Sequence, residues 1–217
     1  MTMERETRTR LLLAAEELFA ERGFAGVSVR EIARLAAANT ASVNYYFGTK
    51  QGLYEKVIQR HVEPINRERL KRLAALLAAD RKPNPRNILA ALIEPVLENL
   101  LDSDGEPNVR LMRLANRVLL DPEDVVQSMD RRVFGEVVQS FLPALRKSLP
   151  DLEEEVLRIR LFLVIGTLLG TLGQCGSGRG KKGSVLGTLS HHKIMESLLD
   201  FVVAGFLQNL RNGKGSA

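Results

Sequence analysis

The side chains with the strongest potential for catalysis or metal binding lie near the C-terminal end of the chain. Cys175 is the single cysteine, and His191, His192 and Glu196 follow it. A thiol and an imidazole can act as nucleophile and base, but the sequence places no oxyanion-stabilising or orienting group beside them. His192 and Glu196 have the i,i+4 spacing of ligands on one helix face, yet two ligands do not make a metal site. We therefore expect no catalytic centre, no metal and no cofactor, and predict that the protein is not an enzyme.

A second group of side chains, between Asn39 and Lys50, has the chemistry of nucleic-acid recognition. A short helix here would place polar or small residues outward and apolar residues inward. Asn44 suits a paired contact with adenine, whereas Tyr45 and Lys50 suit phosphate oxygens. The outward residues are Thr40, Ser42, Asn44 and Tyr45, and the anchoring residues are Val43, Tyr46 and Phe47. On spacing alone, a solvated polar face on an ordinary helical hairpin is the alternative.

Local signals predict the elements that would position these residues. An amphipathic pattern over 8–22 predicts a first helix. Ser28 and Glu31 have the spacing of a capping box, which marks the start of a second helix. Asn39 can cap a third. Two short helices that are joined by a tight turn and braced by a preceding helix form a helix-turn-helix, here at about 28–47.

The rest of the chain also has the helical period, without a convincing alternating strand. A long helix over 49–79 contains Pro64, which should bend it between head and body. Further helices are predicted over 85–102, 107–119, 121–148, 151–172 and 190–211. The expected architecture is all-α with about nine helices. Residues 1–50 form the DNA-binding domain and 51–217 form a helical body.

Composition agrees with an ordinary globular protein. The 217 residues are 45% hydrophobic and 26% charged, and the formal net charge is +5, which is compatible with a polyanionic partner. The lone cysteine suits a reducing cytoplasm, and no signal segment is evident, so we expect a cytoplasmic protein. The most apolar stretch, 161–175, is shorter than the roughly 20 residues of a membrane span. We expect it to form a buried interface helix and expect no membrane partner.

A composite motif extends over roughly the first quarter of the chain. It reads Arg8-x-x-Leu11, Ala14-Ala15-x-x-Leu18-Phe19-x-x-x-Gly23-Phe24, Ser28-Val29-Arg30-x-Ile32-Ala33 and Val43-x-Tyr45-Tyr46-Phe47-Gly48-Thr49-Lys50. This run resembles the DNA-binding domain of the TetR family of transcriptional regulators. The resemblance implies a helix-turn-helix head on a helical body that dimerises and senses a ligand.

The resemblance also assigns individual residues of this chain to DNA. It assigns contacts with DNA bases to Thr40, Ala41 and Asn44. It assigns contacts with the DNA backbone mainly to Ser42, Tyr45 and Lys50. Arg30 could reach a base or a phosphate.

Two departures from the family pattern affect this assignment. The family often has glycine where this chain has Ala37, so a left-handed backbone there would be strained by about 1 kcal/mol, unless the turn is of another type. Family members commonly carry tyrosine at the position of Asn44 and histidine at that of Tyr45. Base preference therefore cannot be taken from the family.

The body is expected to hold a small molecule. Apolar residues over 85–102 and 121–148 could surround a pocket, and arginines and an asparagine between them could supply polar groups. The candidate ligand-binding residues are Arg113, Asn116, Phe134, Val138 and Phe141. The segment at 112–114 resembles the family branch that senses fatty acids or their thioesters. The expected function is a repressor released by a small apolar molecule of this kind; a helical adaptor, or an enzyme using the pocket, is the alternative.

The last two helices are expected to form a homodimer. Small residues in the first would let a neighbouring backbone approach, and the second would supply a broad apolar face. The candidate dimerisation residues are Gly166, Gly170, Leu198, Phe201, Val202 and Phe206. The resemblance implies a four-helix interface between two copies. The expected partners are thus operator DNA, a second copy and a small-molecule effector.

Overall fold

The computed structural model describes residues 2–79, 82–99, 108–118, 121–129, 133–176 and 191–208. All regular secondary structure in these residues is helical, as the periodicity predicts. The ten α-helices are α1 (Thr2–Arg22), α2 (Val29–Leu35), α3 (Thr40–Phe47), α4 (Lys50–Ala79), α5 (Pro85–Glu98), α6 (Val109–Val118), α7 (Glu123–Met129), α8 (Gly135–Ser148), α9 (Glu154–Gly176) and α10 (His191–Leu207).

One predicted helix is wrong in extent. The segment 121–148 was expected to be one helix, whereas the structure describes two, α7 and α8, and residues 130–132 between them lie outside its described part. Helix α8 begins at Gly135, and Phe134 at its N-cap makes no side-chain capping bond. A short π-helical turn at 133–134 leads directly into α8, so the apolar helical pattern continues up to Gly135.

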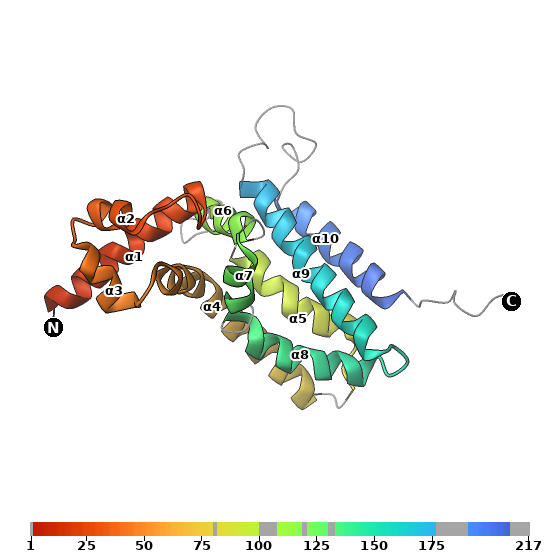
Figure 1. The fold of residues 1–217 in the computed structure, drawn as a ribbon. Coiled ribbons are helices and arrows are strands. Elements are labelled where there is room, and N and C mark those ends of the chain that lie inside the picture. The colour runs from red at the N-terminus through yellow and green to blue at the C-terminus, as the bar shows by residue number, and fades with distance from the viewer. Residues whose placement is uncertain are drawn as a thin grey trace, which may run out of the picture.

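Helices α1, α2 and α3 form a head at one end of the molecule, and α4 leads from it into the body (Figure 1). The turn between α2 and α3 contains Ala37 with φ of +48°, the left-handed conformation that its place in the family pattern suggested. The N–H of Ala38 closes the turn by donating to the carbonyl of Ala33 over 2.9 Å. This turn sets the angle between the two short helices.

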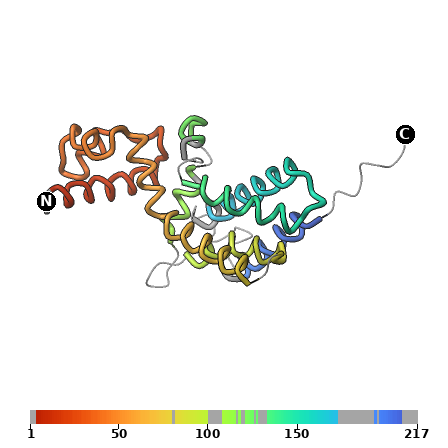
Figure 2. Tube along the Cα trace, turned by 90° about the horizontal axis from the view of Figure 1, so that it is seen from below, coloured from red at the N-terminus to blue at the C-terminus, as the bar shows by residue number. Residues whose placement is uncertain are grey.

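The body is a bundle in which α5, α8, α9 and α10 pack with the second half of α4. The tube view in Figure 2 shows the head projecting from this bundle. Helix α4 continues through Pro64 without a break. The core combines Ile65 and Leu73 of α4 with buried residues of the other body helices, among them Ile93, Phe141, Leu157 and Val202.

A separate apolar core joins the head to the body. It contains Phe19 and Val43 of the head and four residues from the first turns of α4, namely Leu53, Tyr54, Val57 and Ile58. Leu114 and Val118 of α6 and Val125 of α7 belong to the same core. The head is therefore packed against α6 and α7 and does not hang on α4 alone.

Replacing Ala37 by glycine should stabilise the protein. Relief of the left-handed strain, about 1–2 kcal/mol, exceeds the extra backbone entropy of glycine, about 0.5–1 kcal/mol. We expect the free energy of unfolding to rise by about 0.5–1 kcal/mol in denaturant titrations. Ala41→Gly, at an exposed position inside α3, is the matched control and should destabilise by a similar amount. A loss of stability in Ala37→Gly would contradict the strain argument.

Candidate DNA interface and ligand cavity

The exposed face of α3 is the candidate surface for reading DNA bases. Asn39 caps this helix, and its side-chain oxygen accepts a 3.0 Å hydrogen bond from the backbone N–H of Ala41. Val43 is fully buried and fixes the opposite face in the head. The predicted DNA contacts that are exposed on α3 are Thr40, Ala41, Asn44 and Tyr45. One solvent-facing surface thus carries all three residues assigned to bases.

The remaining predicted DNA contacts flank this surface. Arg30 is exposed on α2, whereas Ser42 and Lys50 are half-buried. The Lys50 ammonium lies 4.2 Å from the centroid of the Phe24 ring, a cation–π contact within the head. Burial lowers the pKa of Lys50, and two nearby carboxylates partly oppose this effect. Lys50 is the first residue of α4, where the helix dipole attracts anions.

The capping box that the sequence predicts at the start of α2 is present. The Glu31 N–H donates to the Ser28 hydroxyl oxygen over 3.3 Å, and the Ser28 N–H donates to the Glu31 carboxylate over 2.9 Å. Arg22, at the end of α1, approaches the same carboxylate at 2.8 Å. The hydrogen bonds from Ser28, followed by that from Arg22, lower the pKa of Glu31 to about 2. These contacts tie the start of α2 to the end of α1.

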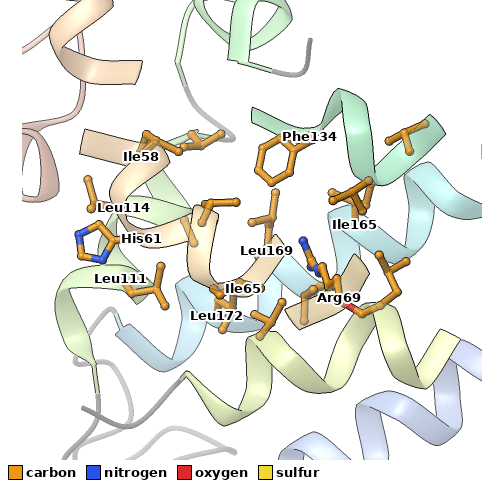
Figure 3. Close-up of a pocket in the computed structure, with 18 residues that line it drawn as sticks. Ile58, His61, Ile65, Arg69, Leu111, Leu114, Phe134, Ile165, Leu169 and Leu172 are labelled. Carbon is orange, nitrogen blue, oxygen red and sulfur yellow. Dashed lines mark hydrogen bonds between the residues drawn. The ribbon is translucent and has the colours of Figure 1, made fainter. Parts of the chain in front are cut away.

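A cavity lies in the body between α4, α5, α6, α8 and α9 (Figure 3). Its empty volume is about 800 Å³, including the part open to solvent. Of its 18 described lining residues, 16 are apolar, and His61 and Arg69 are the polar ones. An apolar enclosure with a few polar groups is the usual form of a small-molecule site.

The structure divides the predicted ligand-binding residues. Phe134 and Val138 line the cavity. Phe141 is fully buried in the adjacent core and does not line it. Arg113 is exposed and borders a different, polar hollow between α1 and α6, and the side chain of Asn116 lies outside the described residues. The sequence pattern located the region of the cavity but not its polar groups.

Sequence reasoning missed His61 and Arg69. Both belong to α4, which had been considered only as the connection between head and body. Ile58, Val62, Ile65 and Arg69 follow the i, i+4, i+7, i+11 spacing of one helix face. A charged residue within an apolar stripe was the signal that could have found Arg69.

A buried carboxylate links the head to the walls of the cavity. Glu16 of α1 is 3% exposed and contacts Arg60 at 3.2 Å, Arg110 at 3.1 Å and His61 at 3.3 Å. The His61 contact does not have hydrogen-bond geometry, and within the described ranges Nε2 has no hydrogen-bond partner. Burial alone would raise the pKa of Glu16, but these neighbours outweigh it and hold the pKa below its ordinary value. One head residue thus engages both α4 and α6.

A second polar link joins the head to the segment before α7. Asp121 accepts a hydrogen bond from the Phe24 N–H over 3.2 Å and another from the Tyr54 hydroxyl. Burial raises the pKa of Tyr54, and its hydrogen bond to Asp121 raises it further. Arg117 of α6 donates to the carbonyl of Glu21 at the end of α1. A shift of α6 relative to α1 would break several of these contacts together.

Helices α9 and α10 present an exposed apolar face. Phe162 is 74% exposed and Phe201 is 72% exposed. The backbone beside Gly166 and Gly170 borders open space. Of the other predicted dimerisation residues, Leu198, Val202 and Phe206 are buried in the protein's own core. The predicted face therefore exists, but only half of the predicted residues point to it, and Phe162 was missed.

The reactive residues near the C-terminal end cannot be placed, because the side chains of Cys175, His191 and His192 lie outside the described residues. None of the described helices is both long and apolar enough to cross a membrane.

Comparison with known proteins agrees with this architecture. The sequence pattern described as "Bacterial regulatory proteins, tetR family" matches residues 11–57. That described as "Tetracyclin repressor-like, C-terminal domain" matches residues 90–205, more than half of the chain. The fold and the exposed α3 surface define a helix-turn-helix transcriptional regulator. The chain belongs to the TetR family, which confirms the resemblance seen in the motif.

The curated relatives match over parts of their length. The probable HTH-type transcriptional regulator YttP of Bacillus subtilis is 41% identical over 61 residues, which cover 28% of this chain and 30% of that protein. The HTH-type transcriptional repressor NemR of Escherichia coli is 26% identical over 132 residues, 61% of this chain and 64% of that protein. The chain thus spans less than two thirds of the length of either relative.

Solved structures share the whole fold. NalD, the secondary repressor of the MexAB-OprM multidrug efflux pump in Pseudomonas aeruginosa, has a TM-score of 0.66 at 20% identity and covers 93% of this chain and 97% of its own. A TetR-family regulator from Mesorhizobium loti has a TM-score of 0.56 at 19% identity, with coverages of 95% and 98%. At such identities the likeness concerns the fold alone.

Replacing Glu16 by glutamine should destabilise the protein by about 1–3 kcal/mol at neutral pH, because Arg60 and Arg110 lose their counter-charge. Both arginines are about half exposed, at 48% and 52%, which limits the cost. Since folding lowers the pKa of Glu16, its contribution is fully present above the unfolded pKa and is lost as the pH falls through the folded one.

Unfolding titrations between about pH 3 and pH 7 measure this effect. The stability gap between the wild type and Glu16→Gln should narrow below about pH 4.5, the ordinary value for the group. Glu17→Gln, at the exposed neighbouring position, should show neither the gap nor the pH dependence. A gap that is constant over this range would contradict the role given to the ionised carboxylate.

Proposed function

We propose that this protein is a ligand-responsive repressor that binds an inverted-repeat operator as a homodimer in the cytoplasm. The observation that carries the proposal is the exposed polar face of α3, capped by Asn39 and braced by α1 and α2, in a chain of the TetR family. A helix presented in this way can enter the major groove and contact base edges.

In this proposal the residues divide by what they contact on DNA. Bases are contacted by Thr40, Ala41 and Asn44. The backbone is contacted by Ser42, Tyr45 and Lys50, and Arg30 reaches either. The 75% exposure of Tyr45 on α3 supports its proposed contact with the DNA backbone. Lys50 supports it through its place at the N-terminus of α4, where phosphate is favoured.

A second copy of the chain docks on the exposed face of α9 and α10. Large apolar side chains such as Phe162 and Phe201 are rarely exposed together on a monomer. The open space beside Gly166 and Gly170 suits close approach of a partner helix. Such a dimer would hold two recognition helices about 35 Å apart, which suits successive major grooves.

The effector occupies the body cavity and lowers operator affinity by moving the heads. Leu111 and Leu114 of α6 line the cavity, while Arg110 of the same helix contacts Glu16 in the head. His61 of α4 lines the cavity and contacts the same carboxylate. A ligand that displaces α4 or α6 therefore shifts α1. By linkage, DNA must weaken effector binding by the same factor, typically about 5–150-fold.

Selection of binding sites from a random pool of duplexes tests the proposed operator. We expect an inverted repeat whose half-sites lie about one helical turn apart or slightly more. Enrichment of a lone half-site, or of no sequence, would overturn the proposal.

On the selected operator, Asn44→Ala and Lys50→Ala should behave differently. Asn44→Ala should cost about 1–3 kcal/mol and relax preference at particular base pairs. Lys50→Ala should weaken binding to all sequences alike and reduce the salt slope by about one unit. Lys147→Ala, exposed on α8, is the matched control and should change neither property. Identical sequence profiles for the two head variants would refute the division into base and backbone contacts.

Replacing Phe162 by aspartate should convert the dimer to a monomer, because dimerisation would then bury an unpaired charge in an apolar interface. Light scattering at micromolar concentration gives the mass, and circular dichroism checks that the helices remain. Leu77→Asp, on an exposed position of α4, is the control and should stay dimeric. A Phe162→Asp protein that remains a dimer would place the interface elsewhere.

A further inference from the structure

We infer that the body cavity binds a monoanionic carboxylic acid with an apolar body, and that Arg69 binds the carboxylate. This inference deepens the proposed effector site and rests on the proposed function for its consequence on DNA. It begins from the contrast between the cavity's apolar walls and the arginine placed among them. Figure 3 shows the Arg69 side chain reaching toward Leu169 and Ile165.

Arg69 is a buried charge whose hydrogen-bond acceptors in the described part of the chain are uncharged. The residue is 6% exposed, and no carboxylate in the described residues forms an ion pair with it. Its Nε donates to the Leu92 carbonyl over 2.7 Å, and its Nη1 donates to the Asn66 side-chain oxygen over 3.0 Å. Both acceptors are neutral.

These two hydrogen bonds hold the guanidinium in place. Asn66 is itself fixed, since its side-chain nitrogen donates to the Val133 carbonyl over 2.7 Å. The Leu92 carbonyl belongs to α5, so Arg69 is tied to an element across from its own helix. A guanidinium that is oriented before binding loses little conformational entropy when it meets a ligand.

The charge on this group decides the ligand class. Burial lowers the pKa of Arg69 to about 10, so the guanidinium remains protonated at neutral pH. A buried charge without a partner is costly, and a ligand that neutralises it gains both the ion pair and charge-assisted hydrogen bonds. A neutral apolar ligand would leave this cost in place, and a cation would increase it.

The rest of the cavity limits the ligand to a single negative charge. The other polar lining residue, His61, lies eight residues earlier on α4, about 12 Å away along the helix axis. The walls between them are apolar (Figure 3), with Ile65 and Leu169 among them. A dianion such as a phosphate monoester would bring a second charge with no cation to receive it. A carboxylate on an aliphatic or aromatic body matches one guanidinium within apolar walls.

The same site explains how binding could reach the head. A ligand body that extends from Arg69 along α4 approaches His61, whose Nε2 lies 3.3 Å from Glu16 and has no hydrogen-bond partner in the part of the chain that the structure describes. A ligand in the cavity would then disturb the polar contacts of Glu16 that join α1 to α4 and α6.

The first test compares ligands on the wild-type protein without DNA. Calorimetric titrations use octanoate, decanoate and 4-butylbenzoate as carboxylates, and 1-octanol and octylamine as matched neutral and cationic probes. Octanoate should bind at least about ten-fold more tightly than 1-octanol, and octylamine should bind most weakly. Equal affinity for octanoate and 1-octanol, or no saturable binding by any of the three carboxylates, would overturn the inference.

The second test removes the charge. Arg69→Met should reduce octanoate affinity by about ten-fold or more while leaving that of 1-octanol nearly unchanged. Arg67→Met is the control, because the Arg67 side chain lies on the same helix and is 75% exposed. This variant should bind octanoate like the wild type. An unchanged octanoate affinity in Arg69→Met would overturn the assignment.

A third readout does not depend on a variant that folds. In carbon-13 spectra of carboxyl-labelled octanoate bound to the wild type, the carboxyl pKa should lie below that of the free acid, because the guanidinium stabilises the ionised form. A raised pKa would place the carboxyl in the apolar part of the cavity and overturn the inference.

Operator binding separates this inference from the proposed function. If octanoate binds through Arg69 and does not change operator affinity, the carboxylate site stands and induction from this cavity fails. If octanoate weakens operator binding in the wild type but not in Arg69→Met, both stand. If selection from random duplexes enriches no operator, but the carboxylates still bind more tightly than 1-octanol and octylamine, only the proposed function fails.

Discussion

The arrangement of the molecule depends on one constraint, the burial of both halves of α4 in different cores. Its first turns place Leu53, Tyr54 and Val57 in the core of the head, and its second half places Ile65 and Leu73 in the core of the body. A single continuous helix transmits rotation and translation along its length. The head therefore cannot tilt relative to the body without disturbing apolar packing in one of the two cores.

Two buried charges, one on this helix and one packed against it, are accommodated in opposite ways. Glu16 is surrounded by Arg60, His61 and Arg110, and these contacts lower its pKa despite its burial. Arg69 has neutral hydrogen-bond acceptors and no carboxylate partner among the described residues. The first arrangement stabilises the junction of head and body in the protein alone. The second leaves a buried charge for which we inferred a ligand carboxylate as partner.

Local sequence signals predicted the head closely because they act over a few residues. The capping box of Ser28 and Glu31 and the cap at Asn39 are formed by groups at most three residues apart, and both are present. The left-handed backbone at Ala37 is one of the two turn conformations that the family motif left open. For 121–148, apolar periodicity predicted one helix, whereas the structure describes α7 and α8, with a π-helical turn at 133–134 before α8. Periodicity indicates which face is buried, but it is less sensitive to where a helix is interrupted.

The sequence by itself determined the fold class, the family, the position of the short helix α3 in the helix-turn-helix and the existence of an apolar face on the last two helices. These properties depend on local spacing and on residue type. Tertiary structure decided which apolar residues of these helices face the core and which are exposed. Val202 is buried, while its neighbour Phe201 is 72% exposed. It also decided that Phe134 lines a cavity and Phe141 does not, and that Arg69 projects among apolar walls. The physical reason is that these outcomes depend on how helices far apart in the chain pack against one another, and helical spacing within one segment does not specify its neighbours.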